Sequence, residues 1–347
     1  MKLKETMIYE KLGNGRVRCG ICSQRCELLP GQRGLCKVRE NRRGKLYSLV
    51  YGKAVDVAID PIEKKPFFHF APGSRAFSVA TVGCNFKCKF CQNWEISQEF
   101  KEIHGKNYSP KDLVTKAKNW YSDGIAYTYT EPAVFYEYVY DTAKEANPEL
   151  YNVLVTNGYF TPEAIKKISG YIDAANVDYK GDYVFYRKYC GATRGDDPVK
   201  EALKTFKKEK IWVEITNLII PGLNDSEGWI RTMCRWIVEN LGDEVPLHFS
   251  RFYPSYKMSN IPPTPVETLE KAWKIARDEG IKYAYIGNVF GHKYESTYCP
   301  SCGNLLIKRR GLEIEEFNID KNLRCKYCGE KIPIKGKEWI NQNLFKE

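Results

Sequence analysis

The middle of this 347-residue chain alternates short apolar runs with polar, helix-length segments. Apolar runs of about four to eight residues predict buried strands, and the segments between them predict amphipathic helices. The expected strands are 77–83, 124–130, 152–156, 174–179, 212–219, 247–252 and 283–286. Repeated strand–helix units imply an α/β fold with a parallel sheet, either open and doubly wound or curved toward a barrel.

Three helix starts are marked by a hydroxyl residue followed by proline. They are Ser109-Pro110, Thr161-Pro162 and Thr264-Pro265, and Thr264 to Glu267 also spells a capping box. The hydroxyl can cap the first turn, and proline is favoured at the first helical position. The chain contains neither G-x-G-x-x-G nor a P-loop sequence, so nucleotide-binding folds of those two kinds have no support.

Thirteen cysteines are unusual for a cytosolic protein, and most of them follow two- and three-residue spacings. Such spacings favour metal ligation over disulfides. Three groups result: Cys19, Cys22, Cys26 and Cys36; Cys84, Cys88 and Cys91; Cys299, Cys302, Cys325 and Cys328. With a boundary at the Pro- and Lys-rich stretch 60–66, we expect a Cys-rich extension at 1–66, a repeat domain at 67–292 and a metal-binding domain at 293–347. Cys190 and Cys234 follow no ligand spacing and are expected to be buried thiols.

The central group, C-x3-C-x2-C, directly follows an expected strand. Three thiolates on one loop can hold an iron–sulfur cluster, whose ordinary [4Fe–4S] form takes four cysteines. With three ligands one iron keeps an open position, where a substrate can bind and react. The alternatives are a zinc site or a fourth cysteine recruited from elsewhere in the chain.

At these residues the chain resembles the radical S-adenosylmethionine (SAM) superfamily, whose pattern is C-x3-C-x-aromatic-C with Phe90 as the aromatic residue. It is similar in particular to relatives of pyruvate formate-lyase activating enzyme, and among these to the radical SAM member of the AmmeMemoRadiSam system. The resemblance implies a partial (β/α)6, TIM-like radical SAM barrel with the cluster in the loop after the first strand. Chemistry in such barrels sits at the carboxyl ends of the strands.

The resemblance also implies SAM contacts at the ends of the first two strands. Asn93 matches the C-x-N of the activating enzymes. Thr130-Glu131-Pro132 matches the G-G-E-P that holds the SAM amino group, although Tyr129 and Thr130 replace the two glycines. Only glycine lacks the Cβ that would obstruct a close backbone approach.

Further SAM contacts are implied at later strand ends. Thr156-Asn157-Gly158 matches a D-T-N-G turn in which Val155 replaces the aspartate, so a cation is not expected to be held there in the same way. Asp178-Tyr179-Lys180 matches D-I-K, near the SAM carboxylate, and Arg251 ends the sixth strand. Asp178 and Lys180 share one face of a strand, so they could instead pair with each other.

The chemistry implied is reductive cleavage of SAM to methionine and a 5′-deoxyadenosyl radical, which then attacks an unidentified protein or small molecule, as in activating enzymes. The electron donor would be a flavodoxin or ferredoxin, and the formal net charge of +11 suits such an acidic partner. AMMECR-type and Memo-like proteins are further candidate partners.

The two outer cysteine groups differ in regularity. Cys299 to Cys328 form two C-x2-C-G knuckles, which are typical of a zinc ribbon with closed tetrahedral coordination. The N-terminal spacing, C-x2-C-x3-C-x9-C, is compatible with zinc, with a second cluster or with incomplete ligation.

Two other classes of function remain open from sequence. One is an RNA-modifying or RNA-binding protein, in which a zinc ribbon and the surplus of basic residues would bind RNA. Because the basic runs 207–210 and 308–310 are short, we do not expect nucleic acid as the partner. The other class is a purely structural metal protein. We expect a cytoplasmic location, because no stretch reaches the ~20 apolar residues of a spanning helix and the start lacks the apolar run of a signal peptide.

Overall fold

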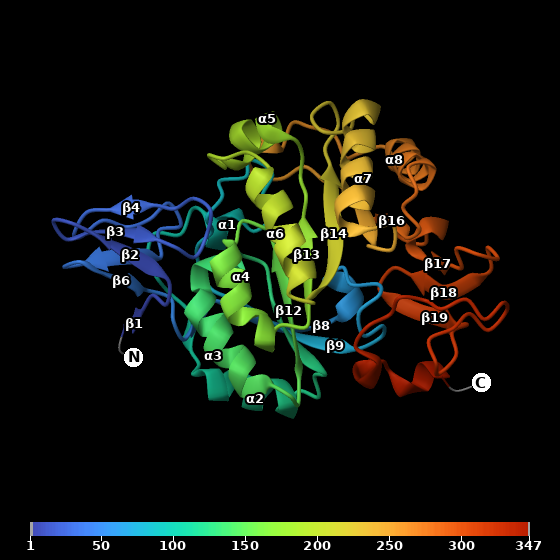
Figure 1. Cartoon of the computed structure of the whole chain (residues 1–347), viewed down its shortest axis with the longest axis horizontal. Coiled ribbons are helices and arrows are strands. Elements are labelled where there is room, and N and C mark those ends of the chain that lie inside the picture. Colours follow the sequence, from blue (N-terminus) through green and yellow to red (C-terminus); the bar gives the residue numbers. More distant parts are fainter. Residues whose placement is uncertain (1–2, 346–347) are drawn as a thin grey trace.

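A computed structural model describes residues 3–345, and its centre is an eight-stranded sheet (Figure 1). The strand order is β16-β15-β14-β13-β12-β11-β9-β8. All strands from β9 to β16 run parallel, whereas β8 is antiparallel to β9. The strands are β8 (Asp56–Pro61), β9 (Arg75–Ala80), β11 (Gly124–Tyr127), β12 (Tyr151–Thr156), β13 (Ala174–Asp178), β14 (Trp212–Ile219), β15 (Leu247–Arg251) and β16 (Ala284–Gly287). The α/β class is confirmed, and each of the seven expected strands is present within a few residues of its expected bounds.

Six helices connect the successive parallel strands. They are α2 (Pro110–Asn119), α3 (Tyr136–Ala146), α4 (Pro162–Ile168), α6 (Asp197–Lys208), α7 (Glu227–Leu241) and α8 (Val266–Asp278), and α1 (Trp94–Ser97) and α5 (Tyr183–Phe185) are short additions. Six strand–helix units are thus followed by a seventh strand, β16. Because β8 and β16 are the two edges, the sheet stays open, as a partial barrel requires. None of the helices formed by residues 3–345 has both the length and the apolar character needed to cross a bilayer.

Two of the three predicted helix starts are confirmed. Ser109 caps α2 in a capping box with Asp112, and Thr161 caps α4. The third prediction is wrong, because α8 begins at Val266 and receives no side-chain cap. The hydroxyl of Thr264 bonds instead to the ends of two strands. It donates to the Ile219 carbonyl at 2.6 Å and accepts from the Phe252 amide at 3.1 Å.

The N-terminal part forms small antiparallel sheets that lie against one end of the central sheet (Figure 1). Its strands are β1 (Lys4–Glu5), β2 (Tyr9–Leu12), β3 (Arg16–Cys19), β4 (Glu27–Leu28), β5 (Arg39–Arg42), β6 (Lys45–Ser48) and β7 (Lys53–Ala54), and β7 pairs with β10 (Lys106–Asn107). The buried apolar residues of this part, such as Val17 and Val38, belong to the same hydrophobic cluster as those of the sheet. One continuous core therefore fixes the N-terminal part on the barrel.

The C-terminal part contains β17 (Thr297–Tyr298), β18 (Leu305–Arg310) and β19 (Glu313–Phe317) in one antiparallel sheet with a separate hydrophobic cluster. It is attached to the barrel by buried polar contacts. The Arg309 guanidinium donates to the Phe68 carbonyl at 3.0 Å and stacks on the Phe68 ring at 4.1 Å.

Candidate active site

A cavity of about 550 Å³ lies at the carboxyl ends of the parallel strands. Side chains from the loop after β9 and from the ends of β11, β12 and β13 line it. The lining includes Cys84, Cys88, Phe90, Cys91, Asn93, Thr130, Glu131, Thr156, Asn157, Asp178 and Lys180. The structure therefore brings every SAM-site residue implied by the resemblance, except Arg251, to one space.

The cysteine loop is held on the barrel by backbone contacts. Lys87 donates its amide to the Cys190 carbonyl at 2.7 Å, and Lys89 donates to the Tyr189 carbonyl at 2.9 Å. From the other side the Gln98 amide donates to the Cys88 carbonyl at 2.9 Å. These contacts fix the loop with its three cysteines in the cavity wall. None of the three forms a disulfide.

The three cysteines of this loop are partly buried, and their thiols are not close enough together to bind one metal ion. Burial raises the pKa of Cys84 and of Cys91, and a hydrogen bond with Cys190 followed by burial raises that of Cys88. Among residues 3–345, these sulfurs do not meet the close mutual spacing that a single ion requires. Cys190 contacts Cys88 but is not among the residues that line the cavity. Three separated thiols in one cavity suit a cubane cluster better than a single zinc ion.

Glu131 shapes the cavity wall, because both of its oxygens accept hydrogen bonds from its neighbours. Oε1 accepts from the Thr156 hydroxyl at 2.8 Å and from the Ala133 amide at 3.1 Å, and Oε2 accepts from the Asn157 amide at 2.8 Å. Burial raises the pKa of Glu131 to about 7, against the effect of these hydrogen bonds. Glu131 thus ties the end of β11 to the end of β12. Asn157, placed by it, donates to Asn85 Oδ1 at 2.7 Å beside Cys84.

Tyr129, which replaces a glycine of the family pattern, keeps a glycine-like backbone. Its φ is +62°, in the left-handed region that costs an ordinary residue roughly 1–2 kcal/mol. The hydroxyl donates to Asp60 at 2.7 Å, and the Lys65 ammonium lies 4.6 Å from the ring centroid. The Tyr129 carbonyl accepts from the Asn93 side chain at 2.8 Å. The Tyr129 backbone therefore adopts a conformation that glycine adopts easily. Its side chain is fixed by the hydrogen bond to Asp60.

Lys180 and Asp178 form an ion pair in the cavity, with Nζ 2.5 Å from Oδ2. The Lys180 side chain is 12% exposed and that of Asp178 33%. Burial lowers the pKa of Lys180, but the Asp178 carboxylate outweighs that effect and raises it overall, so Lys180 is an ammonium at neutral pH. Its Nζ also lies 5.9 Å from the ring centroid of buried Phe90.

Arg251 lies apart from this group. Its guanidinium donates to the Thr264 carbonyl at 2.8 Å, and it is not among the residues that line the cavity. Sequence reasoning missed four residues that do line it at later strand ends: Thr216 and Leu218 on β14, Ser250 on β15 and Asn288 after β16. They belong to no motif, and their place at the carboxyl ends of strands was the signal that could have found them.

The C-terminal cysteines form a second site. The sulfurs of Cys299, Cys302, Cys325 and Cys328 all lie within 4.8 Å of one another, with separations of 3.6 Å and 3.8 Å in two pairs. Tetrahedral zinc at about 2.3 Å from each sulfur would place the sulfurs ~3.8 Å apart. A zinc-ribbon geometry is therefore compatible with this cluster.

Comparison with known proteins finds one family model, similar protein sequences and similar solved structures. Residues 78–234 match the model of the Radical SAM superfamily. An uncharacterized protein of Methanocaldococcus jannaschii is 49% identical over 335 residues, which cover 96% of this chain and 99% of that protein. A protein of the same organism that is named as a glycyl-radical enzyme activating enzyme is 26% identical over 159 residues, covering 44% of this chain and 59% of its own. A domain of pyruvate-formate lyase-activating enzyme from Bacteroides vulgatus has a similar structure, with a TM-score of 0.43 and 15% identity over 48% of this chain and 100% of that domain.

Proposed function

This chain belongs to the radical SAM superfamily and is an enzyme, and we propose that Cys84, Cys88 and Cys91 hold a [4Fe–4S] cluster with one iron open to SAM. The family supports a SAM-cleaving radical enzyme that is similar to activating enzymes. The observation that carries the assignment to these residues is their convergence, from one loop, on a cavity that also holds the Lys180 ammonium.

When bound, the cluster supplies the electron that breaks the bond between the SAM sulfur and its 5′ carbon. Lys180 is suited to bind the SAM carboxylate, since it is buried, charged and part of the cavity wall. Glu131 acts as a positioning residue that orders the ends of β11 and β12 around SAM. Buried Phe90, which lies between Cys88 and Cys91 in the chain, gives the cavity an apolar wall beside the proposed cluster.

The partners and the substrate are inferred only as classes of molecule. Radical SAM enzymes generally take electrons from flavodoxin or ferredoxin, and the net charge of +11 supports an acidic donor of this kind. AMMECR-type and Memo-like proteins remain proposed partners, and the substrate is a protein or small molecule that loses a hydrogen atom to the radical.

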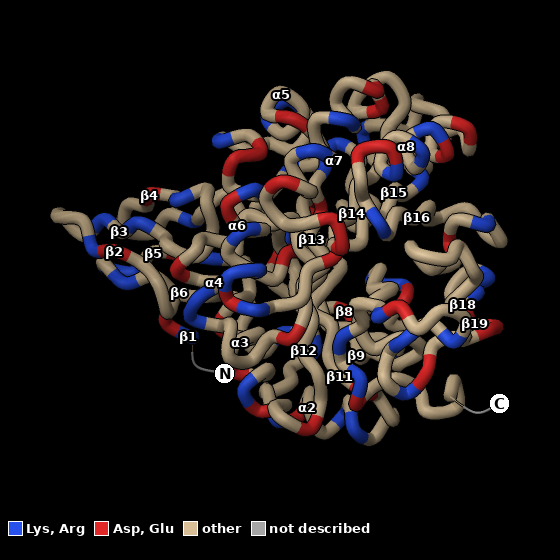
Figure 2. Tube along the Cα trace, turned by 45° about the vertical axis from the view of Figure 1, so that its right-hand side comes forward, with Lys and Arg blue, Asp and Glu red and all other residues tan. Residues whose placement is uncertain are grey.

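RNA binding finds no specific support at the basic run 308–310. Arg309 is buried, and Lys308 pairs with Glu316 at 3.0 Å. Figure 2 shows acidic residues interspersed with the basic ones along the chain. A phosphate backbone would need free, adjacent cations, which this run does not offer.

The test is turnover of SAM by anaerobically reconstituted protein. The reduced wild type should convert SAM to 5′-deoxyadenosine and methionine, as measured by liquid chromatography, and replacing Cys84, Cys88 or Cys91 by alanine should abolish the conversion. Cys234→Ala is the matched control, because it removes a buried thiol of α7 that belongs to none of the three cysteine groups. This variant should cleave SAM as the wild type does. Cleavage by the variant that lacks all three cysteines would refute the proposal.

A further inference from the structure

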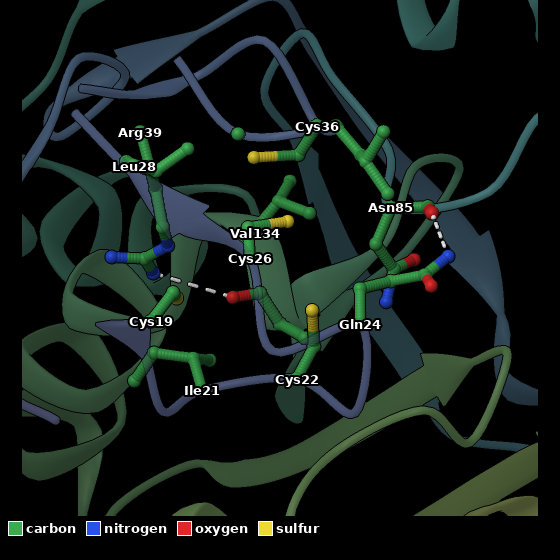
Figure 3. A pocket seen from close by; sticks show the side chains of 13 residues that line it. Cys19, Ile21, Cys22, Gln24, Cys26, Leu28, Cys36, Arg39, Asn85 and Val134 are labelled. Carbon is green, nitrogen blue, oxygen red and sulfur yellow. Dashed lines mark hydrogen bonds between the residues drawn. The ribbon is translucent and has the colours of Figure 1, made fainter. Parts of the chain in front are cut away.

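The four N-terminal cysteines enclose a second, separate cavity. Cys19, Cys22, Cys26 and Cys36 all line it (Figure 3). Cys19 ends β3, and the other three come from the loops that follow β3 and β4. Apolar residues fill most of the remaining wall, including Ile21, Leu28 and Val134.

The spacing of these sulfurs distinguishes them from the C-terminal four. Only the C-terminal set, among residues 3–345, has sulfurs close enough together for a single ion. No three of the N-terminal sulfurs meet that spacing, and all four cysteines line the cavity. Gly34 lines it as well, at a position where a Cβ would be in ordinary van der Waals contact with Cys26 Sγ at 3.7 Å and Cys36 Sγ at 3.8 Å. In a cubane cluster each thiolate binds a different iron, so the ligands stand farther apart than around one zinc ion.

The cavity also carries groups that suit a negatively charged cluster. The buried Arg39 guanidinium lines the cavity, where its Nη2 donates to the Ala133 carbonyl at 3.3 Å and pairs with Glu137 at 2.8 Å. The Ile21 backbone hydrogen-bonds the Cys19 thiol, and the Leu35 backbone hydrogen-bonds the Cys26 thiol. Backbone N–H groups directed at sulfur stabilise a thiolate ligand.

An independent observation comes from Asn85, which lines this cavity and is only 2% exposed. Its side-chain nitrogen has no hydrogen-bond partner in the described part of the chain. A buried N–H donor without an acceptor costs about 1–3 kcal/mol. A cluster sulfide or a thiolate in the cavity would supply the missing acceptor.

We propose that Cys19, Cys22, Cys26 and Cys36 bind a second [4Fe–4S] cluster, distinct from the one on the central motif. Four thiolates leave no open iron, so this cluster does not bind SAM. Its coordination suits one-electron exchange rather than catalysis.

The two cluster sites are neighbours. Gly83, directly before Cys84, packs so closely against the N-terminal loop that a Cβ would lie 2.9 Å from the Cys36 carbonyl. Asn85, directly after Cys84, lines the N-terminal cavity, and its carbonyl accepts from the Gln24 side chain at 2.9 Å. Two paramagnetic clusters held this closely should interact magnetically when both are reduced.

Metal analysis of the whole chain tests the proposal. Anaerobically reconstituted wild type should contain about eight iron, about eight sulfide and about one zinc per chain. The variant with Cys84, Cys88 and Cys91 all replaced by alanine should keep about four iron and an absorption band that bleaches on reduction. A wild type with about four iron and two zinc, or a triple variant without iron, would overturn the proposal.

A reciprocal variant covers the case in which the triple variant fails to fold. Cys22→Ala/Cys26→Ala with an intact central motif should hold about four iron, whereas Cys234→Ala, which removes a buried thiol of α7 outside both cysteine groups, should hold about eight. Electron paramagnetic resonance of reduced wild type should show broadening that is absent from the Cys22→Ala/Cys26→Ala variant. About eight iron in the folded Cys22→Ala/Cys26→Ala variant would refute the second cluster, and this result is independent of SAM cleavage.

Discussion

The Lys180–Asp178 pair allows a quantitative test of SAM binding. Its two side chains meet at 2.5 Å at the carboxyl end of β13, inside the cavity that also holds the cysteine loop. Lys180→Met keeps most of the length of the side chain and removes its charge. If the ammonium binds the SAM carboxylate, the variant loses one charge-assisted hydrogen bond, which is worth about 1.5–3 kcal/mol, or ~10- to 150-fold in affinity.

The pairing predicts that the two residues act as a unit. In Lys180→Met the Asp178 carboxylate loses its counter-charge and repels the SAM carboxylate. Lys180→Met/Asp178→Asn removes that repulsion as well. The double variant should therefore bind SAM no more weakly than Lys180→Met alone, whereas independent contacts would give additive losses.

Anaerobic equilibrium dialysis with labelled SAM measures these affinities, in variants whose iron content equals that of the wild type. Lys188→Met is the matched control, because Lys188 is exposed on the neighbouring segment and is not part of the cavity lining. An affinity of Lys180→Met within about twofold of the wild type would show that the ammonium does not contact SAM.

Two further predictions concern the metal ribbon and the rim of the cavity. Cys302→Ala and Cys325→Ala should each lose about one zinc per chain and lower Tm without changing the absorption of the central cluster, and retained zinc in both variants would contradict the ribbon. Asp60→Asn should lower the free energy of unfolding by about 3–5 kcal/mol at pH 7, because it leaves the buried Lys65 ammonium, 2.7 Å from Asp60 Oδ2, without its carboxylate. Burial raises the pKa of Asp60, but hydrogen bonds from Lys64 and Lys65 outweigh this effect and hold the pKa below its ordinary value. The ionised Asp60 carboxylate therefore stabilises the folded state above about pH 4, and this stabilisation is lost as the pH falls. The difference from wild type in urea unfolding should shrink below about pH 4, and a constant difference down to pH 3 would contradict this reasoning.

Secondary structure was predictable where the determining contacts are local. The parallel strands are apolar runs because both of their faces are buried, and Ser109 and Thr161 cap helices through partners three residues away. Thr264 has the same local sequence but found partners on two distant strand ends, at Ile219 and Phe252. Local spacing does not reveal such competition, so the cap was predicted wrongly.

The candidate site could likewise be predicted in part, and its remaining residues depend on contacts between distant segments. Cysteine spacing and the resemblance to activating enzymes pointed to the cysteine loop and to the ends of β11, β12 and β13, which line one cavity because a parallel barrel brings its carboxyl ends together. Arg251 shows the limit of that reasoning. Successive side chains of a strand face opposite sides, and on β15 it is Ser250 that lines the cavity while Arg251 is bonded to Thr264. A shift of one residue along a strand thus decides whether a side chain reaches the ligand.

The two outer cysteine groups explain when spacing predicts a metal. In the ribbon each knuckle is closed by its own turn, with Gly303 donating to the Cys299 carbonyl at 3.0 Å and Gly329 to the Cys325 carbonyl at 2.9 Å. The local sequence thus positions the two sulfurs of each knuckle, and the knuckles meet with sulfurs 3.6 Å and 3.8 Å apart. The N-terminal loops are instead placed by the barrel, where the Ser23 amide donates to the Tyr159 carbonyl at 2.8 Å. The sulfur separations there depend on that docking and not on the number of residues between cysteines. For this reason the N-terminal spacing left zinc, a second cluster and incomplete ligation open, and only the folded arrangement favours the cluster.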